Sequence, residues 1–188
     1  MTAVVLAGGR SSRFGRDKLA EPMDGRPLLD HAIDAVRPFV DAILVVVAPD
    51  AAPVLPSGTT LIHDPTPFEG PLAGLLAGLQ VAIDPIVLVT GGDTPRLVPA
   101  VIESMVAALA AGVDAVVLEH EGRARPLPIV LRREPAAAAA THLYADGERR
   151  LRAVTEVVAT RVIPEAAWRV FDPDAVTLRD IDAPADLP

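Results

Sequence analysis

Short, unbroken runs of apolar residues recur along the chain and predict its strands. They are continuous rather than alternating, which is typical of strands buried on both faces of a sheet. The runs cover residues 3–6, 42–47, 60–62, 86–89, 115–118 and 127–131. Strands of this kind indicate a mostly parallel sheet.

Helical segments separate most of these predicted strands. Proline opens several of them and glycine follows one, as expected at the two ends of a helix. The predicted helices cover residues 27–36, 70–82, 99–112, 135–145 and 150–158. Alternation of strands and helices predicts an α/β fold, and the 188 residues suit a single domain spanning 1–188.

The amino-acid composition excludes several classes of partner and site. The net charge of −8 argues against nucleic acid and anionic membranes as partners, so a phosphate ligand needs a local basic pocket. Without cysteine, disulfides and thiolate metal sites are excluded. No signal peptide or membrane-spanning stretch is recognisable, and the expected location is the cytoplasm.

The first chemical motif follows the first predicted strand, from Leu6 to Lys18. Glycines at 8 and 9 let backbone N–H groups approach an anion closely. Basic side chains then crowd into nine residues: Arg10, Arg13, Arg16 and Lys18. The spacing fits neither a Walker loop nor a dinucleotide fingerprint. The segment is interpreted as a phosphate-gripping loop; the alternative is a glycine turn with a solvated basic loop.

A carboxylate follows the strand at 86–89, in Gly91-Gly92-Asp93-Thr94-Pro95. In parallel sheets, ligands bind beyond the carboxyl ends of strands, where an aspartate can hold Mg²⁺ against phosphate oxygens. Asp-Thr-Pro is also a common turn sequence. Together with the first motif, Asp93 is predicted to bind the metal.

A third motif combines Asp64, just after a strand, with Gly70 and Gly74 at a helix start. The glycines lie one helical turn apart, so one face of this helix lacks side chains there. A flat base or sugar can lie on that face, with Asp64 accepting hydrogen bonds. Close packing of the helix on a strand is the alternative.

Two arginine pairs offer weaker signals. Arg123 and Arg125 follow a strand and can meet the phosphate of an acceptor, or else belong to a solvated loop. Arg149 and Arg150 can do the same, or pair with local acidic residues. The four histidines have no shared spacing for zinc.

These motifs together resemble the molybdenum cofactor guanylyltransferase family. The likeness rests on Leu-Ala-Gly-Gly with a basic loop ending in Asp-Lys, on Gly-Pro-Leu-Ala-Gly and on Asp-Thr-Pro. It continues through Gly-Glu-Arg-Arg at 147–150 and the segment 180–187, and so spans nearly the whole chain. The first motif is shared with cytidylyl- and sugar-phosphate nucleotidyltransferases.

The resemblance implies a three-layer α/β/α Rossmann-like fold. It also implies Mg²⁺-dependent transfer of GMP from GTP to the molybdenum–molybdopterin cofactor, with release of pyrophosphate. Proteins of cofactor biosynthesis or molybdoenzymes would be further partners. Nucleotide contacts would come from Leu6, Ala7, Gly8, Gly9, Lys18, Asp64, Gly70, Gly74 and Asp93.

The proposed reaction needs no general base, because the attacking phosphate of the acceptor is already largely ionised at neutral pH. The catalytic tasks are alignment and the cancellation of negative charge. Asp93 would hold Mg²⁺, and Lys18, helped by Arg13, would stabilise the departing pyrophosphate.

Two departures from the family pattern affect recognition. Ala48-Pro49-Asp50 stands where an asparagine often lies near the nucleotide. Asp180 and Asp182 replace two asparagines that face the pterin, and two carboxylates would repel its phosphate unless a cation intervenes. They are therefore candidates for acceptor or metal binding, or else turn and capping residues.

Two other functions remain open. One is cytidylyl or guanylyl transfer to a different phosphorylated acceptor. The other is a non-catalytic role in GTP binding or cofactor assembly.

Overall fold

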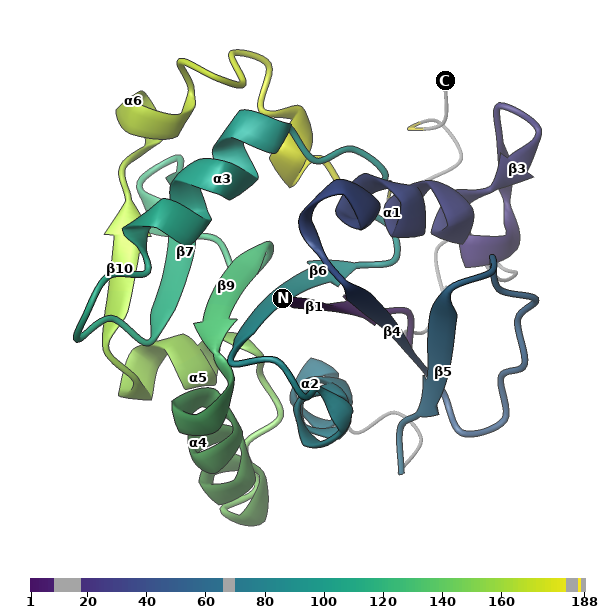
Figure 1. The fold of residues 1–188 in the computed structure, drawn as a ribbon, viewed down its shortest axis with the longest axis horizontal. Helices are drawn as coiled ribbons and strands as arrows, with labels where there is room; N and C mark the ends of the chain where they lie inside the picture. The colour runs from purple at the N-terminus through teal and green to yellow at the C-terminus, as the bar shows by residue number, and fades with distance from the viewer. Residues whose placement is uncertain (9–17, 66–69, 182–185, 187–188) are drawn as a thin grey trace.

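A mixed sheet forms the centre of the computed structural model, which describes residues 1–8, 18–65, 70–181 and 186 (Figure 1). Its strands lie in the order β10-β7-β9-β6-β1-β4-β5, with β8 paired to β7. Their bounds are β1 Thr2–Leu6, β4 Ala42–Val47, β5 Thr59–His63, β6 Ile86–Gly91, β7 Ala115–His120, β8 Arg123–Ala124, β9 Ile129–Arg132 and β10 Thr160–Ile163. A separate hairpin joins β2 (Pro22–Met23) to β3 (Arg26–Pro27).

The sheet is mostly parallel, as predicted. Strand β1 pairs in parallel with both β4 and β6, and β4 pairs in parallel with β5. The exception in the main path is β9, which runs antiparallel between β6 and β7. An apolar run predicts a buried strand but not its direction, so the sequence left this reversal undetermined.

Helices cover both faces of the sheet and make three layers. Figure 1 shows α1 and α3 on one side, with α2, α4 and α5 on the other. The helices are α1 Leu28–Val36, α2 Pro71–Val81, α3 Pro99–Ala108, α4 Arg133–Ala145, α5 Arg152–Val157 and α6 Glu165–Trp168. Short 3-10 turns are η1 Lys18–Ala20, η2 Arg37–Phe39 and η3 Val176–Leu178. The three-layer α/β/α prediction is confirmed.

The apolar run of β1 is explained by burial on both faces. Val5 packs with α1 and α3 in one core, while its neighbour Val4 packs with α2 and α4 in the other. Both side chains are fully buried. A strand at this position has no solvent-facing side, and so its sequence cannot alternate.

The alanine-rich segment is a helix that packs on α2. Ala136 and Ala140, one turn apart in α4, are both fully buried. Their small side chains let α4 lie close to the second core, and α4 begins at Arg133, two residues earlier than predicted. Among the described residues, no helix is long and apolar enough to cross a membrane.

Helix α2 packs so closely on β1 at Gly78 that only glycine fits there. A Cβ at this position would lie 2.6 Å from Cγ1 of Val4, a fully buried residue. We expect Gly78→Ala to lower the free energy of unfolding by about 1–2 kcal/mol, because overpacking outweighs the gain in helix propensity. Denaturant unfolding measures the change.

The matched control is Gln80→Ala on the exposed side of the same helix, which should change stability by less than about 0.5 kcal/mol. An increase in stability for Gly78→Ala would show that α2 does not press on β1 as described.

Candidate functional site

Backbone hydrogen bonds continue past the carboxyl ends of the parallel strands and fix the residues that follow them. Ala7 donates its N–H to the carbonyl of Val46 at 2.7 Å, and Gly92 donates to the carbonyl of Leu6 at 2.9 Å. Asp64 donates its N–H to Val47 at 2.8 Å. Since these strands run in the same direction, Ala7, Asp64 and the Gly92 turn meet at one edge of the sheet.

An ion pair joins the first two predicted motifs at this edge. Nζ of Lys18 lies 2.7 Å from Oδ2 of Asp93, although 75 residues separate them in the sequence. The side chains are 16% and 27% exposed, so both remain accessible to a ligand. A cation and a carboxylate placed together in this way can serve phosphate oxygens and a divalent metal respectively.

The turn that presents Asp93 is thin because it is built from two glycines. A Cβ on Gly91 would lie 2.3 Å from Oδ1 of Asp93, and one on Gly92 would lie 3.3 Å from Cβ of Ala7. Side chains at either position would displace the aspartate or push the turn away from β1. The glycine pair therefore lets Asp93 stay against the end of β1.

Gly74 faces the ends of β1 and β4 and the carboxylate of Asp64. A Cβ there would find Cδ2 of Leu6 at 3.4 Å and Oδ2 of Asp64 at 3.9 Å, which are ordinary contact distances. The structure thus brings together Leu6, Asp64 and Gly74, as expected for one nucleotide-binding wall. Gly74 is also buried, so close helix–strand packing contributes to its position.

The backbone explains why position 70 requires a glycine. Its φ of +91° lies in the region that favours glycine, and a Cβ would lie 2.8 Å from the carbonyl oxygen of Arg149. That same oxygen accepts a hydrogen bond from the N–H of Leu72, in the first turn of α2. The segment after α4 therefore holds the start of α2 in place, a contact that the sequence did not predict.

The C-terminal segment lies against the Asp93 turn. The N–H of Ile181 donates to the carbonyl of Asp93 at 3.0 Å, and Oγ1 of Thr94 donates to Oδ1 of Asp180 at 3.1 Å. Asp180 thus has a hydrogen-bonding role in this chain besides any contact with an acceptor. Its carboxylate ties the segment to the loop that carries Asp93.

The two arginine pairs differ in their surroundings. Arg123, in β8, is exposed and Arg125 just after it is half-buried; both lie beyond the end of β7, which β9 separates from β6 in the sheet. Nε of Arg150 pairs with Glu148 at 2.9 Å, and this hydrogen bonding lowers the pKa of Glu148 to about 2. The guanidinium of Arg149 stacks 4.4 Å above the ring of Tyr144. Of the two roles considered for Arg150, the structure therefore shows pairing with a local acidic residue, Glu148.

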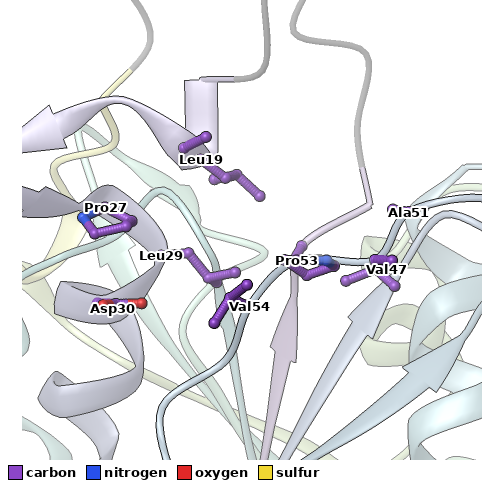
Figure 2. A pocket seen from close by; sticks show the side chains of 11 residues that line it. Leu19, Pro27, Leu29, Asp30, Val47, Ala51, Pro53 and Val54 are labelled. Atoms are coloured by element: carbon purple, nitrogen blue, oxygen red, sulfur yellow. The ribbon is translucent and has the colours of Figure 1, made fainter.

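A hollow of about 340 Å³ opens beside Ala7, on the side of β1 that faces α1 (Figure 2). Its described walls are almost entirely apolar, with Asp30 as their ionisable member. The wall side chains come from η1, the start of α1, and the end of β4 with the segment after it, and include Leu19, Leu29, Val47, Pro53 and Val54. Such walls offer nothing to balance the charge of a triphosphate, and no motif in the sequence indicated this hollow.

Three predicted site residues, Gly9, Arg13 and Asp182, lie outside the described residues. Within the described part of the chain, no group of three or more His, Cys, Asp or Glu side chains is arranged to hold a metal. Asp93 nevertheless fits Mg²⁺, since this ion is commonly held by one or two carboxylates together with substrate phosphates.

Comparison with known sequences points to one family. The model of the MobA-like NTP transferase domain matches residues 3–162. A probable molybdenum cofactor guanylyltransferase of Chloroflexus aggregans is 35% identical, over 100% of this chain and 91% of the relative. A molybdenum cofactor guanylyltransferase of Desulfosudis oleivorans is 32% identical, over 100% and 92% of the two chains.

Solved structures agree in fold. Molybdopterin-guanine dinucleotide biosynthesis protein A of Archaeoglobus fulgidus has a TM-score of 0.80 at 24% identity, covering 100% of this chain and 95% of its own. The 2-C-methyl-D-erythritol 4-phosphate cytidylyltransferase of Thermus thermophilus has a TM-score of 0.72 at 18% identity, over 98% and 94%. With the family model covering most of the chain, the protein belongs to the MobA-like nucleotidyltransferases.

Proposed function

We propose that this chain transfers GMP from GTP to the molybdenum–molybdopterin cofactor and releases pyrophosphate. The ion pair between Lys18 and Asp93, at the shared edge of β1 and β6, is the observation that carries the proposal. The names of its full-length relatives supply the nucleotide and the acceptor.

The reaction is a displacement at the α-phosphorus of GTP. A terminal phosphate oxygen of the acceptor forms the new P–O bond, while the bond to the bridging oxygen of pyrophosphate breaks. Since the second pKa of a phosphate monoester is about 6, the nucleophile is mostly ionised at pH 7 and no base has to remove a proton. The protein must therefore hold two anionic substrates close together.

Lys18 and Asp93 divide this electrostatic task. When the triphosphate enters, the ammonium of Lys18 exchanges part of its contact with Asp93 for phosphate oxygens and stabilises the departing pyrophosphate. Asp93 would hold Mg²⁺ through its carboxylate. Bound Mg²⁺ would neutralise charge on the phosphate oxygens. Arg13, outside the described residues, is proposed to assist Lys18.

The guanosine is proposed to lie on the α2 side of β1. Asp64 accepts hydrogen bonds from the base or ribose beside Gly74, while Gly70, whose Cα–H side faces Arg149, borders the nucleotide with its backbone. Leu6, Ala7, Gly8 and Gly9 provide the backbone beneath the nucleotide. Arg123, Arg125, Asp180 and Asp182 are the proposed contacts with the acceptor, and Asp182 lies outside the described residues.

Removing either member of the ion pair should abolish transfer without unfolding the protein. We expect Lys18→Ala and Asp93→Asn to lower kcat at least 100-fold, since each removes a charge that acts on the transferring phosphates. Their melting temperatures should change far less than kcat, because the pair lies at the edge of the sheet, outside the two hydrophobic cores. Pyrophosphate release and thermal unfolding measure the two effects.

Asp146→Asn, an exposed substitution of the same kind after α4, serves as the control and should retain full activity. Wild-type rates in both the Lys18→Ala and Asp93→Asn variants would eliminate the proposed mechanism.

The choice of nucleotide distinguishes guanylyl transfer from cytidylyl transfer and from a non-catalytic role. With Mg²⁺ present, GTP should raise the melting temperature by mass action, and CTP at equal concentration should raise it far less. Chelation of the metal by EDTA should reduce the shift with GTP. A preference for CTP would indicate a cytidylyltransferase, whereas tight GTP binding without pyrophosphate release would indicate a non-catalytic role.

A substitution at Gly74 tests whether the guanosine binds beside Asp64 and Gly74. An added methyl meets only ordinary contacts, so Gly74→Ala should not lower stability, in contrast to Gly78→Ala one turn later. We expect its KM for GTP to rise about tenfold, equivalent to roughly 1.4 kcal/mol of binding. An unchanged KM in steady-state assays would place the guanosine elsewhere.

A further inference from the structure

A second, smaller pocket lies between the Asp93 turn and the C-terminal segment. Its volume is about 170 Å³, and its described lining consists of Pro95, Arg96, Val176, Arg179, Ile181 and Asp186. One wall, Pro95 and Arg96, comes from the loop after β6, while the other comes from the C-terminal segment that begins at Val176. The pocket therefore exists only because the C-terminal segment folds back over this loop.

Hydrogen bonds fix these two walls relative to Asp93. Ile181 donates its N–H to the carbonyl of Asp93, and Oγ1 of Thr177 accepts the N–H of Val98 at 3.1 Å. The carboxylate of Asp172, only 2% exposed, accepts the N–H groups of Val176 and Thr177 at 2.9 and 2.8 Å. Pocket and proposed metal ligand thus share one rigid support.

The described lining carries a net positive charge, although the chain as a whole has a net charge of −8. Two arginines oppose one aspartate, Asp186. The exposed Arg96 guanidinium makes no hydrogen bond or ion pair with any described residue. Arg179 uses Nη2 to donate to the carbonyl of Asp174 at 2.9 Å, and several of its other N–H groups stay available.

We propose that this pocket binds the phosphate-bearing end of the acceptor, with Arg96 and Arg179 as its anion-binding residues. The inference rests on the proposed function. A transfer between two anionic substrates needs a second cationic site beside the metal ligand, and this pocket adjoins the Asp93 turn directly. Guanidinium groups suit the task because they donate paired hydrogen bonds to phosphate oxygens.

The size and the wall chemistry of this pocket suit one end of the acceptor, not the complete acceptor molecule. The pocket is smaller than the roughly 300–1,000 Å³ typical of sites that enclose a complete small molecule. Val176, Ile181 and Pro95 provide an apolar rim for the carbon atoms next to the phosphate. GTP is placed elsewhere, because Lys18 and the Asp64–Gly74 wall lie toward β1 and α2.

Kinetics with each substrate varied separately test this assignment. We expect Arg96→Ala and Arg179→Ala each to raise KM for the molybdenum–molybdopterin acceptor about tenfold, since each removes a charge-assisted contact. KM for GTP and the thermal shift produced by GTP with Mg²⁺ should stay at wild-type values. Arg96→Lys should recover part of the loss.

Arg161→Ala, an exposed arginine on β10, is the matched control and should leave both KM values unchanged. Equal KM values for the acceptor in the wild type and in both the Arg96→Ala and Arg179→Ala variants would overturn the proposal.

A direct binding measurement separates failure of the pocket from failure of the proposed function. Inorganic phosphate is titrated without nucleotide, and the Nε–H signals of Arg96 and Arg179 are followed by NMR after assignment with the two alanine variants. Saturable shifts of both signals support the anion site even if no GMP transfer occurs. Absence of any saturable shift overturns it, whatever the enzyme does with GTP.

Discussion

Parallel pairing of β1 with β4 and β6 is the constraint on which the site depends. Because these strands point the same way, their carboxyl ends share one edge, and the backbone hydrogen bonds of Ala7 and Gly92 extend that alignment beyond the strands. Only then can Lys18 reach Asp93 across 75 residues. A slip of β1 by one residue would exchange its two buried faces and separate the pair.

Charge is distributed so that a strongly acidic protein can accept anionic substrates. Lys18 balances Asp93 at the sheet edge, while Arg96 and Arg179 line the pocket that adjoins the same turn. Asp180, the residue that seemed to oppose an anionic acceptor, accepts a hydrogen bond from Thr94 and helps to hold that turn. The aspartate thus has a structural partner within the chain.

Much of the architecture was predictable because it depends on local patterns. Fully apolar runs identified β1, β4 and β6, and prolines located the starts of α2 and α3. Glycines next to strand ends pointed to the Leu6 and Asp93 loops, and the order of motifs matched the family. These signals lie within a few residues of the features that they predict.

Other features depend on contacts between distant segments, and no local pattern reports them. The reversal of β9 is decided by its neighbours in the sheet. Likewise, the carbonyl of Arg149 at the start of α2 and the return of the C-terminal segment to Asp93 arise from tertiary packing. The β2–β3 hairpin and β10 have runs too short or too polar to stand out.

Guanylyl transfer is tested most directly by following the GMP group itself. The protein is incubated with Mg²⁺, the molybdenum–molybdopterin cofactor and GTP labelled at the α-phosphate, and the pterin product is isolated and weighed by mass spectrometry. Guanylyl transfer to the pterin yields a labelled guanine dinucleotide of the pterin, formed in equal amount to pyrophosphate. Label that stays in GTP, or a product formed only from CTP, would contradict it.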